Sequence, residues 1–181
     1  WGQMDLFTYS YAWAGDAKAM DSNLYAAIPA DDVRKLQFAE PIGDYTDLMP
    51  INKFYAPDKV IGGQANITTD YVYLRVAEMY LLYAEAAAKA GDASAAQKLL
   101  KALLSERLPN TAYIDGLAGQ ALLDEIYLQT RIELWGEGKS YLSLKRNKGT
   151  VVRGDNHLSN VGVPINYDDE RLTFEIPQSE I

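Results

Sequence analysis

The side chains with the greatest potential for chemistry in this sequence are one histidine and two acidic clusters. His157 has no second His and no Cys to share a transition metal, and no G-x-S-x-G turn offers it a serine nucleophile. The carboxylates of Asp31–Asp32 and Asp168–Glu170 are adjacent in sequence. Glycosidases instead need two carboxyl groups roughly 5 to 9 Å apart across a cleft. We therefore expect no catalysis, no metal and no cofactor, and a glycoside hydrolase stays a remote alternative.

Aromatic and polar side chains near the amino terminus suggest recognition of a sugar rather than a reaction. Sugars stack their C–H faces on aromatic rings while amides and carboxylates meet their hydroxyl groups. The stretch 1–16 lacks helical periodicity and contains both kinds of side chain. The candidate ligand-binding residues are Trp1, Tyr9, Tyr11, Trp13 and Asp16. The alternative is that these aromatics are the apolar anchors of a loop region.

The bulk composition excludes several classes of partner. The net charge of −8 repels nucleic acid and anionic lipid surfaces, so neither is an expected partner. The chain contains no Cys, which excludes disulfides and thiol chemistry. No run approaches the roughly 20 apolar residues that span a bilayer. Because the sequence starts without Met, we expect it to be a piece of a longer protein whose targeting or lipidation signal lies upstream.

The most regular apolar pattern in the chain begins near Tyr71. Its members follow the i, i+3, i+4, i+7 spacing of one helix face: Tyr73, Val76, Ala77, Tyr80, Leu81, Ala84, Ala87 and Ala88. Thr68, Thr69 or Asp70 can cap the start of this helix, and Gly91 can take the left-handed conformation that ends it.

Further helices are predicted after this one. Asp92 or Ser94 opens a second helix that runs to about Leu104 and pairs with the first as an antiparallel hairpin. A third helix is predicted from about Gly119 to Trp135, and an amphipathic segment at Tyr141–Arg146 follows two interrupting glycines. The expected inner face of the third helix comprises Leu123, Ile126, Tyr127, Thr130 and Leu134.

The predicted fold class is mainly α, with tetratricopeptide-like antiparallel helical hairpins and long loop-rich insertions. We expect one domain over 1–181: a loop-rich, ligand-facing segment at 1–70, a helical scaffold at 71–146 and carboxy-terminal loops at 147–181. A short helix at about Ala17–Tyr25 and an extended run at Leu172–Ile176 complete the prediction. Because a helical hairpin cannot bury both of its faces, we expect at least one more helical layer against it.

Three stretches, in this order, resemble the SusD/RagB family. Residues 73–92 (YLRVAEMYLLYAEAAAKAGD) are similar to its R-x-A-E-x-Y-L-x-x-A-E-A helix. Residues 130–146 (TRIELWGEGKSYLSLKR) resemble its E-R-R-x-E-L-x-x-E-G-x-R-x-x-D-L-x-R signature, and residues 174–181 (FEIPQSEI) resemble its terminal motif. Ile28–Pro29, Asp32–Arg34 and Lys53–Phe54 are weaker matches. Gln129 and Ser143 replace the usual Glu and Asp, which predicts a thinner charge network.

The resemblance implies the carboxy-terminal part of a glycan-binding lipoprotein on the outer face of a Gram-negative outer membrane. Its implied partners are a glycan ligand and a SusC-like TonB-dependent transporter, with membrane contact only through a lipid anchor outside this chain. A helical protein-interaction module without glycan affinity is the main alternative.

The signature charges have a structural interpretation of their own. Arg75 with Glu78, Arg131 with Glu133, and Glu137 with Arg146 are placed for ion pairs that tie helices together. In this interpretation the signature identifies a fold and does not locate a ligand.

Overall fold

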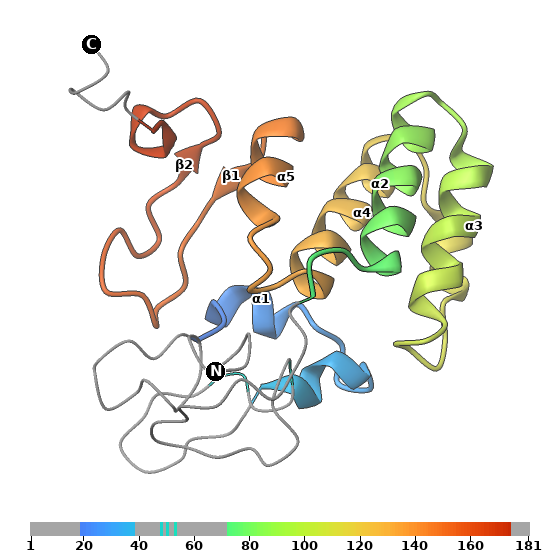
Figure 1. Ribbon diagram of the computed structural model, residues 1–181, viewed down its shortest axis with the longest axis horizontal. Coiled ribbons are helices and arrows are strands. Elements are labelled where there is room, and N and C mark those ends of the chain that lie inside the picture. The colour runs from blue at the N-terminus through green and yellow to red at the C-terminus, as the bar shows by residue number, and fades with distance from the viewer. Residues whose placement is uncertain (1–18, 39–47, 49, 51–52, 54–71, 175–181) are drawn as a thin grey trace.

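The computed structural model describes residues 19–38, 48, 50, 53 and 72–174, and this part of the chain is mainly helical (Figure 1). Its helices are α1 (Ser22–Ala26), α2 (Val76–Lys89), α3 (Ala93–Leu104), α4 (Gly119–Glu133) and α5 (Ser140–Arg146). Two short strands, β1 (Thr150–Val151) and β2 (Ile165–Asn166), pair antiparallel. The mainly α prediction is confirmed.

Helices α2 and α3 form the predicted antiparallel hairpin. Gly91 ends α2 with a φ of +85°, and the Asp92 side chain accepts a hydrogen bond from the Ala95 amide at 2.9 Å to cap α3. The start of α2 was predicted too early. Its amino-terminal cap is Arg75, whose backbone is extended and whose side chain makes no capping bond, so Thr68, Thr69 and Asp70 do not cap this helix.

The hairpin and α4 share one apolar core, in which α2 packs against both α3 and α4 (Figure 1). The third helical layer expected against the hairpin is therefore α4. On α2 the buried stripe is narrower than predicted: Ala77, Leu81, Ala84 and Ala87 are buried. Three predicted members of that face are instead exposed: Tyr73, Val76 and Tyr80.

Helix α4 buries a wider face than its periodicity predicted. Ile126, Thr130 and Leu134 are buried as expected, but Leu123 and Tyr127 are only half-buried. Leu122, Gln129, Ile132 and Glu133 are buried as well. Leu122 extends the core shared with the hairpin, whereas Gln129, Ile132 and Glu133 meet residues from the amino-terminal part of the chain, which helical spacing alone does not reveal.

A second, smaller core fastens that amino-terminal part to α4. It consists of Met20, Leu24, Ile28, Phe38 and Ile132, and the Phe38 ring meets the Trp135 ring edge to face with centroids 5.0 Å apart. Helix α1 is capped by Asp21 and spans Ser22–Ala26, so it starts later than the predicted Ala17.

The segment after α5 carries features that the sequence analysis missed. The sequence predicts only polar turns where β1 and β2 lie, since strands of two residues leave almost no alternation pattern. The predicted extended run at Leu172–Ile176 is wrong at its start, because Leu172 closes a 3₁₀ turn over Glu170–Leu172. Thr173 is extended, and residues 175 and 176 lie outside the described part.

Among the described residues, no helix combines the length and apolar character that a membrane crossing requires.

Candidate functional site

The predicted sugar-contacting residues, Trp1, Tyr9, Tyr11, Trp13 and Asp16, all lie outside the described residues. The groups that can be examined for chemistry are therefore the charged residues and the cavities of the helical part.

The centre of the largest charge cluster is Glu133 at the end of α4, which is 4% exposed. Its carboxylate accepts hydrogen bonds from Arg75 Nη1 and Arg107 Nη2 at 3.0 Å, from Arg107 Nε at 3.1 Å and from Arg34 Nη1 at 3.3 Å. Its carbonyl oxygen accepts from Arg75 Nη2 at 2.7 Å and from Lys53 Nζ at 3.0 Å. One residue thus binds four cations that come from four separate segments.

The other members of this cluster are bonded to one another. Arg34, 2% exposed, donates to both oxygens of buried Asp32 and, at 2.6 Å, to the side-chain oxygen of Gln129. Glu137 accepts from Arg75 at 2.7 and 2.9 Å and lies 3.0 Å from Lys53 Nζ. Gly136 and Gly138, with φ of +75° and +74°, make the tight turn that brings Glu137 back toward α2.

Burial and charge act in opposite directions on the groups of the Glu133 cluster. Burial raises the pKa of Glu133, but the hydrogen bonds and charges of Arg107, Arg34 and Arg75 outweigh it and lower the pKa to about 2. Burial also lowers the pKa of Lys53 to about 8, against the opposing effect of Glu137. The carboxylate is therefore held ionised, which suits an ion-pair anchor and not a proton donor.

A cavity of about 300 Å³ adjoins the Glu133 cluster and is lined by Arg34, Lys53, Arg75 and Arg107. The cationic groups beside it already donate to Asp32, Glu133, Glu137 or Gln129. A substrate anion would have to replace carboxylates that are already well bonded, so this cavity is a weak candidate for a binding site.

A second charge cluster surrounds Glu85 on α2. Its carboxylate accepts from Arg146 Nε and Nη2 at 2.7 and 2.9 Å, from Lys89 at 2.6 Å and from Asn147 at 3.3 Å. Burial raises the pKa of Glu85, and the bonds from Arg146, Lys89 and Asn147 lower it to about 2. This cluster fastens α5 to α2.

The ion pairs predicted from sequence have the wrong partners. Arg75 pairs with Glu133 and Glu137 rather than Glu78, and Arg146 pairs with Glu85 rather than Glu137. The Arg131 guanidinium lies over the Tyr127 ring, 5.8 Å from its centroid, and not on Glu133. Arg75 precedes α2 with an extended backbone, and Arg131 and Glu133, two residues apart on α4, point in different directions. The partners of Arg75 and Arg146 therefore lie 58 to 62 residues away. The structural interpretation of these charges is nevertheless supported.

Sequence reasoning missed Arg107 and Glu85, and it noticed Arg34 and Lys53 only as weaker family matches. Glu85 carried a usable signal: it lies four residues after Leu81 and eight after Ala77, so it continues a buried stripe. A charge at such a position needs a buried partner. Arg107 follows α3 and had no comparable signal.

The two unusual residues of the signature remain part of these networks. Gln129 joins Arg34 to Glu125, since its amide nitrogen donates to Glu125 at 2.9 Å. Ser143 is 1% exposed and accepts from Asn147 at 3.4 Å. The substitutions at Gln129 and Ser143 therefore remove charge from the networks, as expected, but both side chains still form hydrogen bonds in them.

Asp32 and Asp169, which belong to the two acidic clusters considered for hydrolysis, each bind an arginine two residues further along the chain. Asp32 is buried against Arg34, and Asp169 caps the 3₁₀ turn and binds Arg171 at 2.6 Å. His157 lies in a turn with its Nε2 3.0 Å from an oxygen of Asp21. Within the described part, no group of three or more His, Asp or Glu side chains is arranged to hold a metal ion.

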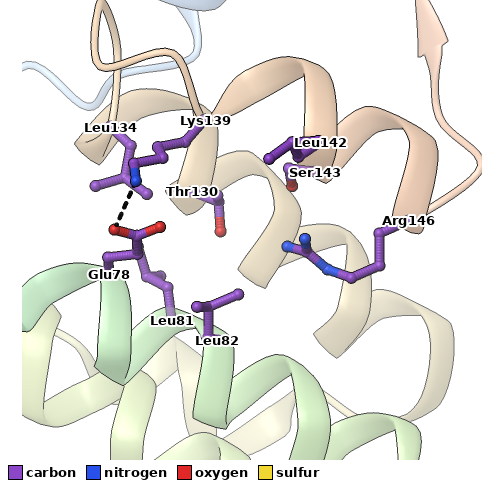
Figure 2. A pocket seen from close by; sticks show the side chains of 9 residues that line it. All are labelled: Glu78, Leu81, Leu82, Thr130, Leu134, Lys139, Leu142, Ser143 and Arg146. Carbon is purple, nitrogen blue, oxygen red and sulfur yellow. Dashed lines mark ion pairs between the residues drawn. The ribbon is translucent and has the colours of Figure 1, made fainter. Parts of the chain in front are cut away.

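Figure 2 shows a cavity of about 210 Å³ between α2, α4 and α5. The Lys139–Glu78 ion pair, 3.2 Å long, lies at one end and Arg146 lies at the other. Leu81, Thr130 and Leu134 also line this cavity. The charged groups at the two ends connect α2 to α5 and to the turn before α5. We therefore assign this cavity a structural role and not a binding role.

Comparison with solved structures finds the same arrangement in longer proteins from Bacteroides. A SusD-like carbohydrate binding protein from Bacteroides vulgatus ATCC 8482 is 30% identical with a TM-score of 0.61, over 83% of this chain and 31% of that one. A SusD superfamily protein from Bacteroides thetaiotaomicron VPI-5482 is 29% identical with a TM-score of 0.66, over 90% and 38%. A SusD superfamily protein from Bacteroides vulgatus ATCC 8482 is 25% identical with a TM-score of 0.67, over 95% and 35%. The chain thus spans about a third of the length of these structures.

A comparison with curated proteins gives no significant match. The model of the SusD family matches residues 37–173, about three quarters of the chain. The match includes α2 to α5, the Glu85 cluster, and the Glu133 cluster apart from Asp32 and Arg34. The chain therefore belongs to the SusD/RagB family.

Proposed function

We propose that this protein binds oligosaccharides at the surface of the outer membrane and delivers them to a SusC-like TonB-dependent transporter without altering them. Membership of the SusD/RagB family supports carbohydrate binding at the family level, and one similar structure is named as a carbohydrate binding protein.

The observation that carries the non-catalytic part is the state of the signature carboxylates. Glu133 and Glu85 are each about 4% exposed and bonded to two or more cations. Acid–base catalysis of glycoside cleavage needs a carboxyl group that can hold and release a proton near the working pH. Carboxylates with a pKa of about 2 do not meet that requirement.

The stretch that contains Trp1, Tyr9, Tyr11, Trp13 and Asp16 remains our proposed glycan contact. Isothermal titration against a panel of soluble polysaccharides should detect weak binding without turnover. Trp13→Ala and Tyr11→Ala should each weaken that binding, because a stacked ring is lost, while the thermal midpoint stays nearly unchanged.

Tyr83→Ala is the matched control for these variants, since Tyr83 on α2 is 62% exposed and belongs to the scaffold. Equal affinity in Trp13→Ala, Tyr11→Ala and Tyr83→Ala would remove the amino-terminal stretch from the site. Release of reducing sugar that disappears in Asp32→Asn or Asp168→Asn would contradict the absence of catalysis.

One observation favours an interaction module as the second candidate. Helix α2 and the residues before it expose apolar side chains to solvent: Tyr73 at 79%, Leu74 at 74%, Val76 at 71% and Tyr83 at 62%. Co-purification with the transporter in the absence of any glycan affinity would favour this alternative over glycan capture.

A further inference from the structure

Two adjoining cavities lie along α4, and only the second is lined by members of the Glu85 cluster. One, of about 330 Å³, lies between α1, α4, α5 and the segment that starts with β1. The other, of about 520 Å³, lies between α4, the end of α2 and the turn at 146–150. Tyr127 and Thr150 line both cavities, which are therefore neighbours, and we call the pair the Tyr127 groove. Its two-part shape fits a ligand longer than one ring.

Aromatic rings are held in fixed positions in the groove. The Tyr141 hydroxyl donates to the Leu172 carbonyl at 2.8 Å. The backbone at Gly149 approaches Tyr127 so closely that a Cβ there would lie 2.8 Å from the tyrosine hydroxyl. Both rings are half-buried. Rings that are fixed and partly exposed lose little freedom when a sugar face stacks on them.

Several polar groups of the groove have no hydrogen-bond partner among the described residues. These are the Tyr127 hydroxyl, the Arg131 guanidinium, whose contact is the face of Tyr127, and the Lys148 ammonium. The cations of the Glu133 cluster, in contrast, donate to carboxylates. Arg131 is half-buried, so its unused donors are costly unless water or a ligand meets them.

The charge of the groove is opposite to that of the whole chain. Arg131, Arg153 and Lys148 line it without a carboxylate partner in the described part, and Lys89 and Arg146 share Glu85. Its lining carboxylates are Asp21, which binds His157 and two backbone amides, and Asp124, which accepts from Gln120. A protein with a net charge of −8 therefore gathers cations in this groove.

We propose that the Tyr127 groove binds an acidic oligosaccharide, with one uronic acid carboxylate meeting Arg131 in the first cavity and another meeting Lys148 in the second. Sugar faces stack on the sides of Tyr127 and Tyr141 that Arg131 and Lys145 leave open. Guanidinium groups bind carboxylates with two parallel hydrogen bonds, and Arg131 has its donors available for one. The inference rests on the proposed glycan-binding function and adds a ligand class and a place. A neutral glycan would leave these cations unpaired.

The test compares oligogalacturonates with neutral galacto-oligosaccharides of the same length by isothermal titration. The acidic series should bind about tenfold more tightly, and raising the salt should reduce this advantage because salt screens exposed charges. Arg131→Gln and Lys148→Gln should each lower the affinity for the acidic series about three- to tenfold and lower neutral binding by much less. Lys98→Gln, which removes an exposed cation from α3, should change neither.

Arg131→Lys keeps the positive charge and should retain part of the preference for acidic oligosaccharides. This variant therefore distinguishes the effect of losing the charge from the effect of disturbing the fold. If Arg131→Gln fails to fold, the exposed Lys148 carries the test alone. Equal affinity for the two series, or acidic binding unchanged in Lys148→Gln and Arg131→Gln, overturns the acidic groove and leaves glycan binding standing. Absence of binding to every oligosaccharide overturns the proposed function together with this inference.

Discussion

The bundle of helices α2, α3 and α4 and the carboxy-terminal segment at 147–174 are attached to the amino-terminal part of the chain in different ways. In the bundle, the Glu133 carboxylate of α4 binds Arg34 as well as Arg75 and Arg107. In the carboxy-terminal segment, the Asp21 carboxylate accepts the Gly154 amide at 2.6 Å and approaches His157 at 3.0 Å, while Ser22 donates to Asp155 at 2.6 Å.

The two regions thus use a carboxylate in two ways: Glu133 forms buried ion pairs, whereas Asp21 accepts hydrogen bonds from backbone amides. Full charges in a buried setting bind strongly but leave a large penalty when one partner is removed. Backbone amides carry no net charge, so the Asp21 contact depends on how closely the chains approach. The Glu133 cluster should therefore weaken when a charge is removed, and the Asp21 contact should weaken when a larger residue fills the space at Gly154.

Removing the charge of Glu133 should have the largest effect on stability. Glu133→Gln leaves Arg34, Arg75 and Arg107 with a neutral partner inside the fold. We expect the free energy of unfolding to fall by about 3–5 kcal/mol in urea denaturation. Glu106→Gln, on an exposed side chain close to α3, should change it by less than about 0.5 kcal/mol. A loss at Glu133 as small as that of the control would show that the cluster is not an anchor.

Adding a methyl group at Gly154 should have the next largest effect on the free energy of unfolding. A Cβ at this buried glycine would lie 2.1 Å from Ser22 Oγ and 3.2 Å from the Asn23 amide nitrogen. Gly154→Ala should therefore push the carboxy-terminal segment away from α1 and cost about 2 kcal/mol, measured by urea denaturation. Gly116→Ala is the matched control, because a Cβ there meets nothing within 4 Å. Equal unfolding free energies for the two variants would show that the close approach at Gly154 does not hold this segment in place.

The sequence predicted the features that depend on local patterns and missed those that depend on pairs of distant residues. The spacing of Leu81, Ala84 and Leu100 indicated the hairpin, because helical periodicity is local and repeats many times. Glu133 and Arg34 are 99 residues apart, and no local pattern pairs them. Only resemblance to a family indicated that such charges matter, and it did not give their partners. The proposed aromatic contacts lie outside the described residues and stay a prediction.

Acid should weaken the bundle by titrating Glu133. Because the folded pKa, about 2, lies below the ordinary value of 4.5, the unfolded chain binds the proton first as the pH falls. This contribution to stability is fully present above about pH 4.5 and is lost as the pH falls toward 2. From pH 5 to pH 3 we expect Glu133 to account for on the order of 1–2 kcal/mol. Urea denaturation of the protein and of Glu133→Gln at both pH values measures this part as the difference between their pH dependences.

The smallest effect is expected for an ion pair with short distances but an exposed setting. Lys101 Nζ lies 2.7 and 2.8 Å from the two oxygens of Asp115, yet these side chains are 34% and 62% exposed. Lys101→Ala should change the unfolding free energy by less than about 1 kcal/mol, since water competes for both charges. A loss comparable to that of Glu133→Gln would show that distance, and not burial, sets the strength of these connectors.

The position of Glu133 along the chain also bears on the order in which the protein is made. Arg34, Lys53, Arg75 and Arg107 all precede it, so a ribosome releases four cations of this cluster before it adds the carboxylate that joins them. The α2–α3 hairpin needs only neighbouring stretches and can close earlier during synthesis, whereas contacts between distant residues form late because closing a long loop costs entropy. The cluster can thus form only after α4 has been synthesised, later than the α2–α3 hairpin.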